Sequence, residues 1–422
     1  MDSDLLGLAA VLALVCFVAG VVSVSRLPPA LKLLVYAGLL LRGVGAVLRY
    51  EVLLRFYGGV GDAKAYYREG LVYAEYFSKL DFSPFFDPTL WHAKVWWGTQ
   101  FMYFPSGIVL SLIGPTMLGA FVVFSLFAFL GLVGFAVAFR RSYPSVPVSR
   151  YVRWIWLFPS LWYWPSSVGK ESITMMGLGL AVAGFIGRGS RMNWGLLSVG
   201  LLLVFAIRPQ VAAVVLLSMI VAQWLSFRTP WTVGRVVQGV LILGLGLAGI
   251  WYSMRTIGVG GYDVEGVQSY IADDPARRLG GGSGIEAVTI DWNGVALAMV
   301  NTLLRPFPFE ATNGPMIVAS LEICAFWVIA WVRRRRLIAS LRYWRSDRFL
   351  RLALTFVLIY SVALGMMLTN LGIIARQRIF LFPFLFLLLE AAPKPRRQVR
   401  RTREPWTPLG QEAPLAGAGE IR

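Results

Sequence analysis

TMLGAFVVFSLFAFLGLVGFAVAF, residues 116–139, decides the fold: it holds no charged side chain and runs directly into Arg140 and Arg141. An α-helix needs about 20 apolar residues to cross the hydrocarbon core of a bilayer. In that core the backbone has to satisfy its own hydrogen bonds, and an apolar run of this length is too long for a strand. The stretch therefore predicts a helix that spans a membrane.

The composition of the whole chain agrees with this prediction. Of 422 residues, 57% are hydrophobic and 15% are charged, whereas soluble proteins carry about 25% charged residues. This excludes a soluble globular enzyme, and the aromatic content of 14% excludes a disordered chain. The sequence predicts an all-α bundle of about eleven spans in one domain, residues 1–392, with a disordered basic tail at 393–422. The other expected spans are 5–25, 31–49, 153–168, 171–187, 193–207, 210–227, 234–254, 316–332, 350–369 and 378–392.

The basic residues predict the orientation of these spans. The net charge of +18 is typical of nucleic-acid binding, but the basic side chains occur in short clusters between apolar runs, as in the cytoplasmic loops of membrane proteins. The strongest cluster, 333–336, places the C-terminus in the cytoplasm and the loops 50–100 and 255–315 outside. The short run 101–114 is then a re-entrant or interfacial helix. A twelve-span alternative, in which 101–114 crosses, places the loop 50–100 inside.

Several ionisable residues fall at the predicted outer ends of spans, where charges are costly unless they are paired or line a cavity filled with water. We interpret the basic members as a pocket for a phosphate or diphosphate, since arginine offers a planar fork of donors and lysine a point charge. The alternative is snorkelling and structural ion pairs. The set comprises Lys170, Glu171, Arg208, Arg305, Glu310, Arg376 and Arg378.

The segment FPSLWYWPSSVGKES, residues 158–172, is the sharpest local feature. Its prolines and the Ser-Ser-Val-Gly run break one helix, and Lys-Glu-Ser opens the next. A broken helix at membrane depth is tolerated where it is buried in protein or lines a cavity, and the new N-terminus offers N–H donors to an anion. The competing interpretation is a tight hairpin with a capping serine.

Asp62 opens the first long loop, in GDAKAYY at 61–67. It can act as a general base or as a ligand of a divalent cation, or it can simply cap a helix over 63–78. The single histidine, His92, excludes a multi-histidine metal site, and Cys16 and Cys324 lie inside apolar runs, so no metal cluster is indicated. A divalent cation, Mg²⁺ or Mn²⁺, stays open as a cofactor.

The order of these features resembles the GT-C class of membrane glycosyltransferases, which use lipid-linked sugar donors. The resemblance covers the loop that opens at Asp62, FMYFPSG at 101–107 and the hairpin IGPTML at 113–118. The blocks FPSLWYWPSSVGKES, RPQ, LLRPFPFEATN and IIARQR look like those of membrane proteins linked to bacterial polysaccharide synthesis.

The resemblance implies a glycosyltransferase or polysaccharide polymerase at the outer face of the bacterial cytoplasmic membrane. Its partners are membrane lipid, a donor sugar linked to polyprenyl phosphate or diphosphate, and a glycan acceptor, with no role for nucleic acid. Asp62 or Glu171 is the expected base. The expected phosphate ligands are Lys170, Arg208, Arg305, Arg376 and Arg378, and the expected sugar contacts are Tyr66, Trp164 and Glu310. The alternatives are a transporter or flippase of a lipid-linked oligosaccharide or another anion, and a non-catalytic scaffold.

Overall fold

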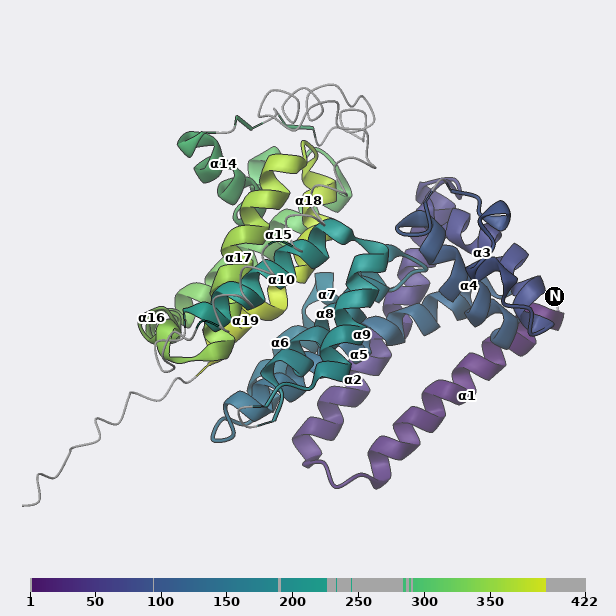
Figure 1. Ribbon diagram of the computed structural model, residues 1–422, viewed down its shortest axis with the longest axis horizontal. Coiled ribbons are helices and arrows are strands. Elements are labelled where there is room, and N and C mark those ends of the chain that lie inside the picture. Colours follow the sequence, from purple (N-terminus) through teal and green to yellow (C-terminus); the bar gives the residue numbers. More distant parts are fainter. Residues whose placement is uncertain are drawn as a thin grey trace, which may run out of the picture.

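The computed structural model describes residues 2–225 and 291–391, apart from 94 and 189–190, and a few isolated residues between 226 and 290. The expected span 234–254, most of the loop 255–315 and the tail 393–422 lie outside the described residues. The described part is a bundle of helices without a β-strand (Figure 1). The predicted all-α class is therefore confirmed.

Ten helices with their connecting turns make up residues 2–225. The first two are long, α5 is the longest, and α6 and α7 are two short helices separated at Pro159. In order they are α1 (Asp2–Val24), α2 (Pro29–Glu51), α3 (Asp62–Ser78), α4 (Thr99–Ile113), α5 (Met117–Ser142), α6 (Ser149–Leu157), α7 (Pro159–Tyr163), α8 (Lys170–Ile186), α9 (Trp194–Ile207) and α10 (Pro209–Trp224).

The C-terminal half adds helices that pack against α5, α6 and α10. Among them α18 and the α19 that follows are bent by 54° relative to each other, and α19 is almost fully buried. These helices are α14 (Trp292–Leu303), α15 (Gly314–Val332), α16 (Arg334–Tyr343), α17 (Arg348–Met367), α18 (Leu371–Gln377) and α19 (Phe382–Glu390).

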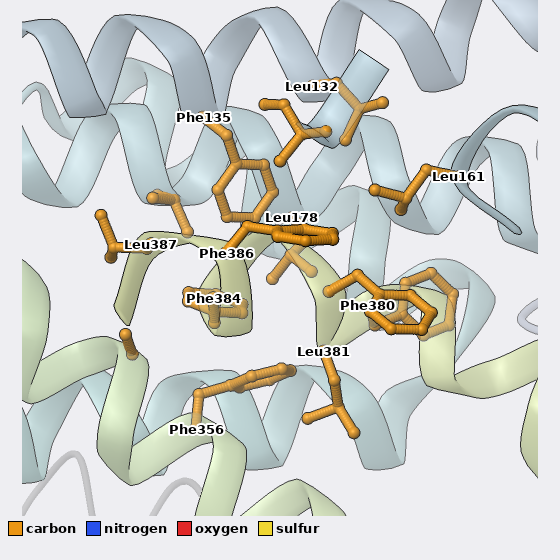
Figure 2. Packing of buried hydrophobic residues seen from close by; sticks show 14 of the residues in the cluster. Leu132, Phe135, Leu161, Leu178, Phe356, Phe380, Leu381, Phe384, Phe386 and Leu387 are labelled. Atoms are coloured by element: carbon orange, nitrogen blue, oxygen red, sulfur yellow. The ribbon is translucent and has the colours of Figure 1, made fainter. Parts of the chain in front are cut away.

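The core lies where α19 meets α5 and α17. Phe384 of α19 contacts Phe135 of α5 with ring centroids 5.1 Å apart and Phe356 of α17 at 4.5 Å, as Figure 2 shows. Beside this aromatic core, the backbones of α5 and α8 pack directly against each other. An ideal Cβ added to Gly179 of α8 would lie 1.8 Å from the carbonyl oxygen of Gly131 in α5. Glycines at this crossing let the two helices approach closely, which is how helices associate in membranes.

The number of spans is smaller than predicted when it is judged by length and hydropathy. Five described helices pass, namely Gly7–Val24, Pro29–Phe56, Met117–Ser142, Gly314–Val332 and Arg348–Met367, and the bent pair Leu371–Phe380 and Phe382–Glu390 makes a sixth. These helices support a multi-pass membrane protein. The expected count of about eleven is not confirmed.

The helices over three expected spans are too short for this test. Those at 171–187, 193–207 and 210–227 have 17, 14 and 16 residues, or about 21–26 Å at 1.5 Å per residue, against a core of about 30 Å. The expected span 153–168 is the broken pair α6 and α7, as Pro159 predicts. The run 101–114 forms α4, a helix of 15 residues that is also shorter than a span.

The bundle has two ends, which we name after a buried glutamate at each. One end, which we call the Glu171 end, holds α3, the starts of α5, α8 and α15, and α18. The other, the Glu390 end, holds the ends of α5, α8 and α15, and α16. In Figure 1, α14 and α18 lie at the top and α16 lies at the lower left. Ionisable side chains gather at both ends.

Candidate functional site

A buried carboxylate, Glu171, is the centre of the candidate site. Its side chain is 1% exposed and accepts hydrogen bonds from two arginines that come from distant parts of the chain. Arg208 Nη2 donates to Glu171 Oε1 at 2.6 Å, and Arg376 Nη2 donates to Oε2 at 2.8 Å. Each carboxylate oxygen therefore has its own guanidinium. A buried charge that is compensated in this way is stable in a low-dielectric interior.

Local sequence places both arginines at helix breaks. Arg208 ends α9 and precedes Pro209, which occupies the first position of α10, so the chain reverses at the arginine. Proline is favoured at this position because its missing N–H has no helical partner there. Arg376 lies in α18, whose start is capped by the side chain of Asn370 on the N–H groups of Gly372 and Ile373. Both arginines thus face Glu171 from short connecting structures.

Lys170 precedes Glu171 and brings a third cation to the site. Its ammonium donates to Thr99 Oγ1 at 3.1 Å, at the start of α4. Gly98 has a φ of +70°, which glycine adopts without strain, and its N–H donates to Ala206 O at 2.7 Å. This turn ties the loop before α4 to the end of α9. The first long loop and the Arg208 break therefore meet beside Lys170.

Asp62 reaches the cluster from the start of α3. The chain arrives through Gly58, Gly59 and Gly61, all with positive φ, so a tight turn separates α2 from α3. The Asp62 carboxylate lies 3.6 Å from Arg376 Nη1 and is 64% exposed. The interpretation of Asp62 as a helix cap is wrong, because Gly61 holds the cap position and no side chain caps α3. The carboxylate points to the arginine and to solvent.

Tyr66, one turn after Asp62, is buried beside the cluster. Its ring packs on Tyr103 at 6.1 Å and its hydroxyl bonds with Thr99. Burial raises the pKa of Tyr66 well above its ordinary value, and the charges of Asp62 and Glu171 raise it further. The hydroxyl therefore stays protonated. Because the ring is buried, the prediction that Tyr66 offers a stacking surface to a sugar is not supported.

The assembled site carries an excess of positive charge. Three cations, Lys170, Arg208 and Arg376, face two carboxylates, Glu171 and Asp62. The Nε atoms of Arg208 and Arg376 are buried and have no hydrogen-bond partner among the described residues. The net positive charge favours an anion such as a phosphate, whose oxygens accept charge-assisted hydrogen bonds from arginine and lysine.

The same arrangement does not fit a divalent cation. No group of three or more His, Cys, Asp or Glu side chains comes together in the described parts of the chain. Asp62 is the only site carboxylate with substantial exposure, and its nearest charged neighbour is Arg376. A site for a divalent cation such as Mg²⁺ needs several oxygen ligands and an excess of negative charge. Lys170, Arg208 and Arg376 themselves provide the positive charge that a metal ion would otherwise supply to a phosphate.

Three predicted members of the basic pocket lie elsewhere. Arg305 and Glu310 pair with each other at 2.8 Å, and Arg305 Nη1 also donates to Asn301 at 2.9 Å. Partial burial opposes ionisation of Glu310, but hydrogen bonds from Arg305 and from the Phe307 N–H outweigh it and lower the pKa of Glu310. Arg378 is buried and donates to the carbonyl oxygen of Arg305. The prediction of one common cluster is thus correct only for Lys170, Glu171, Arg208 and Arg376.

The Trp164 ring is in contact with a cation outside the cluster. The guanidinium of Arg49 lies over its ring at 5.2 Å and over Tyr163 at 5.3 Å. Arg49 Nη2 further contacts Ser167 Oγ at 3.5 Å. Arg49 covers one face of the ring, and the sugar contact at Trp164 stays a prediction.

Sequence reasoning missed two acids that the structure places in networks. Glu322, inside the spanning helix α15, accepts from the N–H of Ser160 at 2.5 Å and from its hydroxyl. A charged residue within an apolar run was the available signal. Glu69 lies 2.6 Å from His92 Nδ1, so His92 belongs to a pair rather than standing alone at the interface. Glu69 follows Tyr66 by three residues, which places both on one side of α3.

A comparison with protein-family models gives no match, and neither do comparisons with curated proteins and with solved structures.

Proposed function

We propose that the chain is a membrane glycosyltransferase or polysaccharide polymerase. It acts on a donor sugar linked to polyprenyl phosphate or diphosphate, at the outer face of the bacterial cytoplasmic membrane. In this proposal the Glu171 end is outside, the C-terminus is in the cytoplasm, and about eleven segments cross the membrane, with the short helices α8, α9 and α10 among them. The resemblance to the GT-C class and the basic clusters at the Glu390 end support it.

One observation carries the proposal. Arg208 and Arg376 come from helix breaks 168 residues apart, and Glu171 fixes both of them beside Lys170 and the exposed carboxylate of Asp62. A transfer reaction from a phosphate-linked donor needs cations for the leaving phosphate and a base for the acceptor. Both kinds of group meet here, at the end of the bundle where spanning helices begin.

The proposed reaction assigns a different task to each charge. The acceptor hydroxyl attacks the anomeric carbon, its proton passes to the Asp62 carboxylate, and a new C–O bond forms. The bond between the anomeric carbon and the phosphate oxygen breaks, and its electron pair leaves with the lipid phosphate or diphosphate. Lys170, Arg208 and Arg376 stabilise that negative charge. Glu171 is a positioning residue that holds the two guanidiniums, because both of its oxygens are already occupied by arginines.

The test is transfer by the purified chain. Radiolabelled sugars linked to polyprenyl phosphate or diphosphate are incubated with the protein and an acceptor glycan, and product and bound donor are measured on the same preparation. The proposal expects both donor binding and transfer. Binding with movement across vesicles but without bond cleavage would replace it with a transporter or flippase. Absence of donor binding would leave a non-catalytic scaffold.

A further inference from the structure

The helix α16, at the Glu390 end, divides its arginines between two opposite faces. It begins at Arg334, two residues after the spanning helix α15 ends at Val332, and it runs to Tyr343. Residues 323–346 contain six arginines and no aspartate or glutamate. With no acid nearby in the sequence, these arginines need negatively charged partners from other parts of the fold or from outside the protein. The two faces of α16 differ in which of these partners they have.

The inward face is saturated by one buried acid. Glu390, the last residue of α19, is fully buried. It lies 2.6 Å from Arg336 Nη1, 3.7 Å from Arg333 Nη2 and 3.1 Å from Arg150 Nη2. It also accepts a hydrogen bond of 2.9 Å from Trp154 Nε1. These contacts, with Ser340 buried between them, fix α16 against the bundle.

The outward face combines arginines with large apolar side chains. Arg334 lies over the ring of Trp331 at 4.8 Å, which joins the end of α15 to the start of α16. The members are separated by three or four residues, so they form one continuous stripe. They are Trp331, Arg334, Arg335, Ile338, Leu341 and Arg342, and all six are exposed.

The stripe continues an exposed apolar surface on a helix that is long and apolar enough to cross a membrane. On the spanning helix α15 the exposed side chains are aliphatic or aromatic, among them Leu321, Val328 and Val332. Positive charge starts immediately beyond Val332, at the level where the hydrocarbon core gives way to headgroups. In Figure 1 α16 lies at the lower left end of the bundle, at the tip of α15 and α17. With α15 as a span, the stripe falls at headgroup depth.

We propose that this stripe is a binding surface for anionic phospholipid headgroups in the leaflet at the Glu390 end. Ile338 and Leu341 enter the boundary between headgroups and acyl chains, and Arg334, Arg335 and Arg342 bind the lipid phosphates. A helix with arginines beside apolar residues lies in the plane of the interface and is attracted to anionic lipid. A nucleic acid or an acidic protein would pair with the arginines but would leave Ile338 and Leu341 in water.

An environment-sensitive probe at residue 338 tests this directly. The full chain with Cys16→Ser, Cys324→Ser and Ile338→Cys is labelled with the fluorophore NBD and reconstituted into vesicles of phosphatidylcholine alone or with one quarter phosphatidylglycerol. We expect blue-shifted emission that strengthens in the anionic vesicles. Lipid titration in detergent gives the apparent affinity for phosphatidylglycerol.

Two matched variants separate the stripe from total charge. Arg334→Gln, Arg335→Gln and Arg342→Gln together should lower that affinity at least about tenfold, since each basic residue near an anionic surface contributes about fivefold. Arg55→Gln, Arg68→Gln and Lys79→Gln remove three exposed positive charges at the other end and should change it little. Emission typical of water in both vesicles, or equal loss in both variants, would overturn the proposal.

Discussion

Arg376 donates a hydrogen bond of 2.8 Å to Glu171, although 205 residues separate the two in the sequence. The same carboxylate accepts from Arg208 at 2.6 Å. One acid thus sets the position of two cations, and the group is left with more positive than negative charge once Lys170 is included. With Asp62 counted, three cations face two carboxylates at this end of the bundle, and this excess of positive charge is the feature that favours an anion.

Glu171→Gln should destabilise the protein and make it responsive to anions. The amide keeps the size of the side chain but leaves Arg208 and Arg376 without a counter-charge, at a cost of about 1–3 kcal/mol because both arginines still reach some water. Thermal unfolding in detergent measures the loss. Pyrophosphate should restore more of the stability in this variant than in the parent protein.

The control for that variant is Glu310→Gln, which breaks the Arg305 pair at 2.8 Å in a more exposed place. Its effect should be smaller, since partly exposed ion pairs contribute about 0.2–1 kcal/mol. An unchanged unfolding temperature for Glu171→Gln, or an equal loss in both variants, would mean that Glu171 does not hold the two arginines.

Arg208→Lys and Arg376→Lys should each weaken donor binding or turnover about 10- to 100-fold. Lysine keeps the charge but loses the planar fork, and one charge-assisted hydrogen bond contributes about 1.5–3 kcal/mol. Donor binding and transfer rates on the purified variants check this. Arg68→Lys is the control, because Arg68 pairs with Glu69 on an exposed surface of α3. Normal binding by both site variants would contradict a phosphate contact.

Gly179→Ala should destabilise the bundle more than Gly43→Ala does. A Cβ at Gly179 would lie 1.8 Å from Gly131 O, whereas nothing lies within 4 Å of a Cβ at Gly43. Both glycines lie in helices, so the gain in helix propensity is the same in the two variants. The difference between their stabilities therefore measures the close packing at the crossing of α5 and α8. Overpacking costs about 1–3 kcal/mol. Equal unfolding temperatures for the two variants would show that the helices separate without penalty.

Cysteines at residues 62 and 335 should react with an impermeant reagent from opposite sides of the membrane. The contacts place Asp62 beside Arg376 at the Glu171 end, while Arg333 and Arg336, which flank residue 335, contact Glu390 at the other end. A cysteine at 310 should label together with 62. The background is Cys16→Ser and Cys324→Ser. Labelling of 62 and 335 from one side would contradict the proposed orientation.

The helical class and most helix positions were predictable because a long apolar segment in a lipid bilayer satisfies its backbone hydrogen bonds by forming an α-helix. The break at Pro159 and the start of a helix at Lys170 followed from proline and glycine in the same way. The number of membrane spans was harder to predict. The segments 193–207 and 210–227, expected as spans on either side of Arg208 and Pro209, form helices of 14 and 16 residues, which are too short to count as spans by length.

The charged members of the candidate site were all among the residues expected from the sequence, since charges at span ends are costly and tend to pair. The sequence did not show which acid each arginine pairs with. Arg305 has Glu310 five residues away and uses it, whereas Arg376 has no acid nearby in sequence and crosses to Glu171. Burial could not be inferred from the sequence either. A tyrosine can pack in a core or stack on a sugar, and only the structure shows that Tyr66 is 4% exposed and packs on Tyr103.

Asp62→Asn should keep donor binding and lose transfer. The amide preserves the shape of the side chain but cannot accept the proton of the acceptor hydroxyl. Stability should change little, because the carboxylate is 64% exposed and lies 3.6 Å from Arg376. Asp87→Asn is the matched control, since Asp87 is a partly exposed acid of the same loop whose carboxylate accepts hydrogen bonds from the N–H and hydroxyl of Thr89. Binding and product formation are measured on the same preparations of both variants.

If Asp62→Asn turns over at the parent rate, Asp62 is not the base. Glu171 is then an unsuitable substitute because two arginines occupy its oxygens, and Glu69 with His92 becomes the acid–base pair to mutate next.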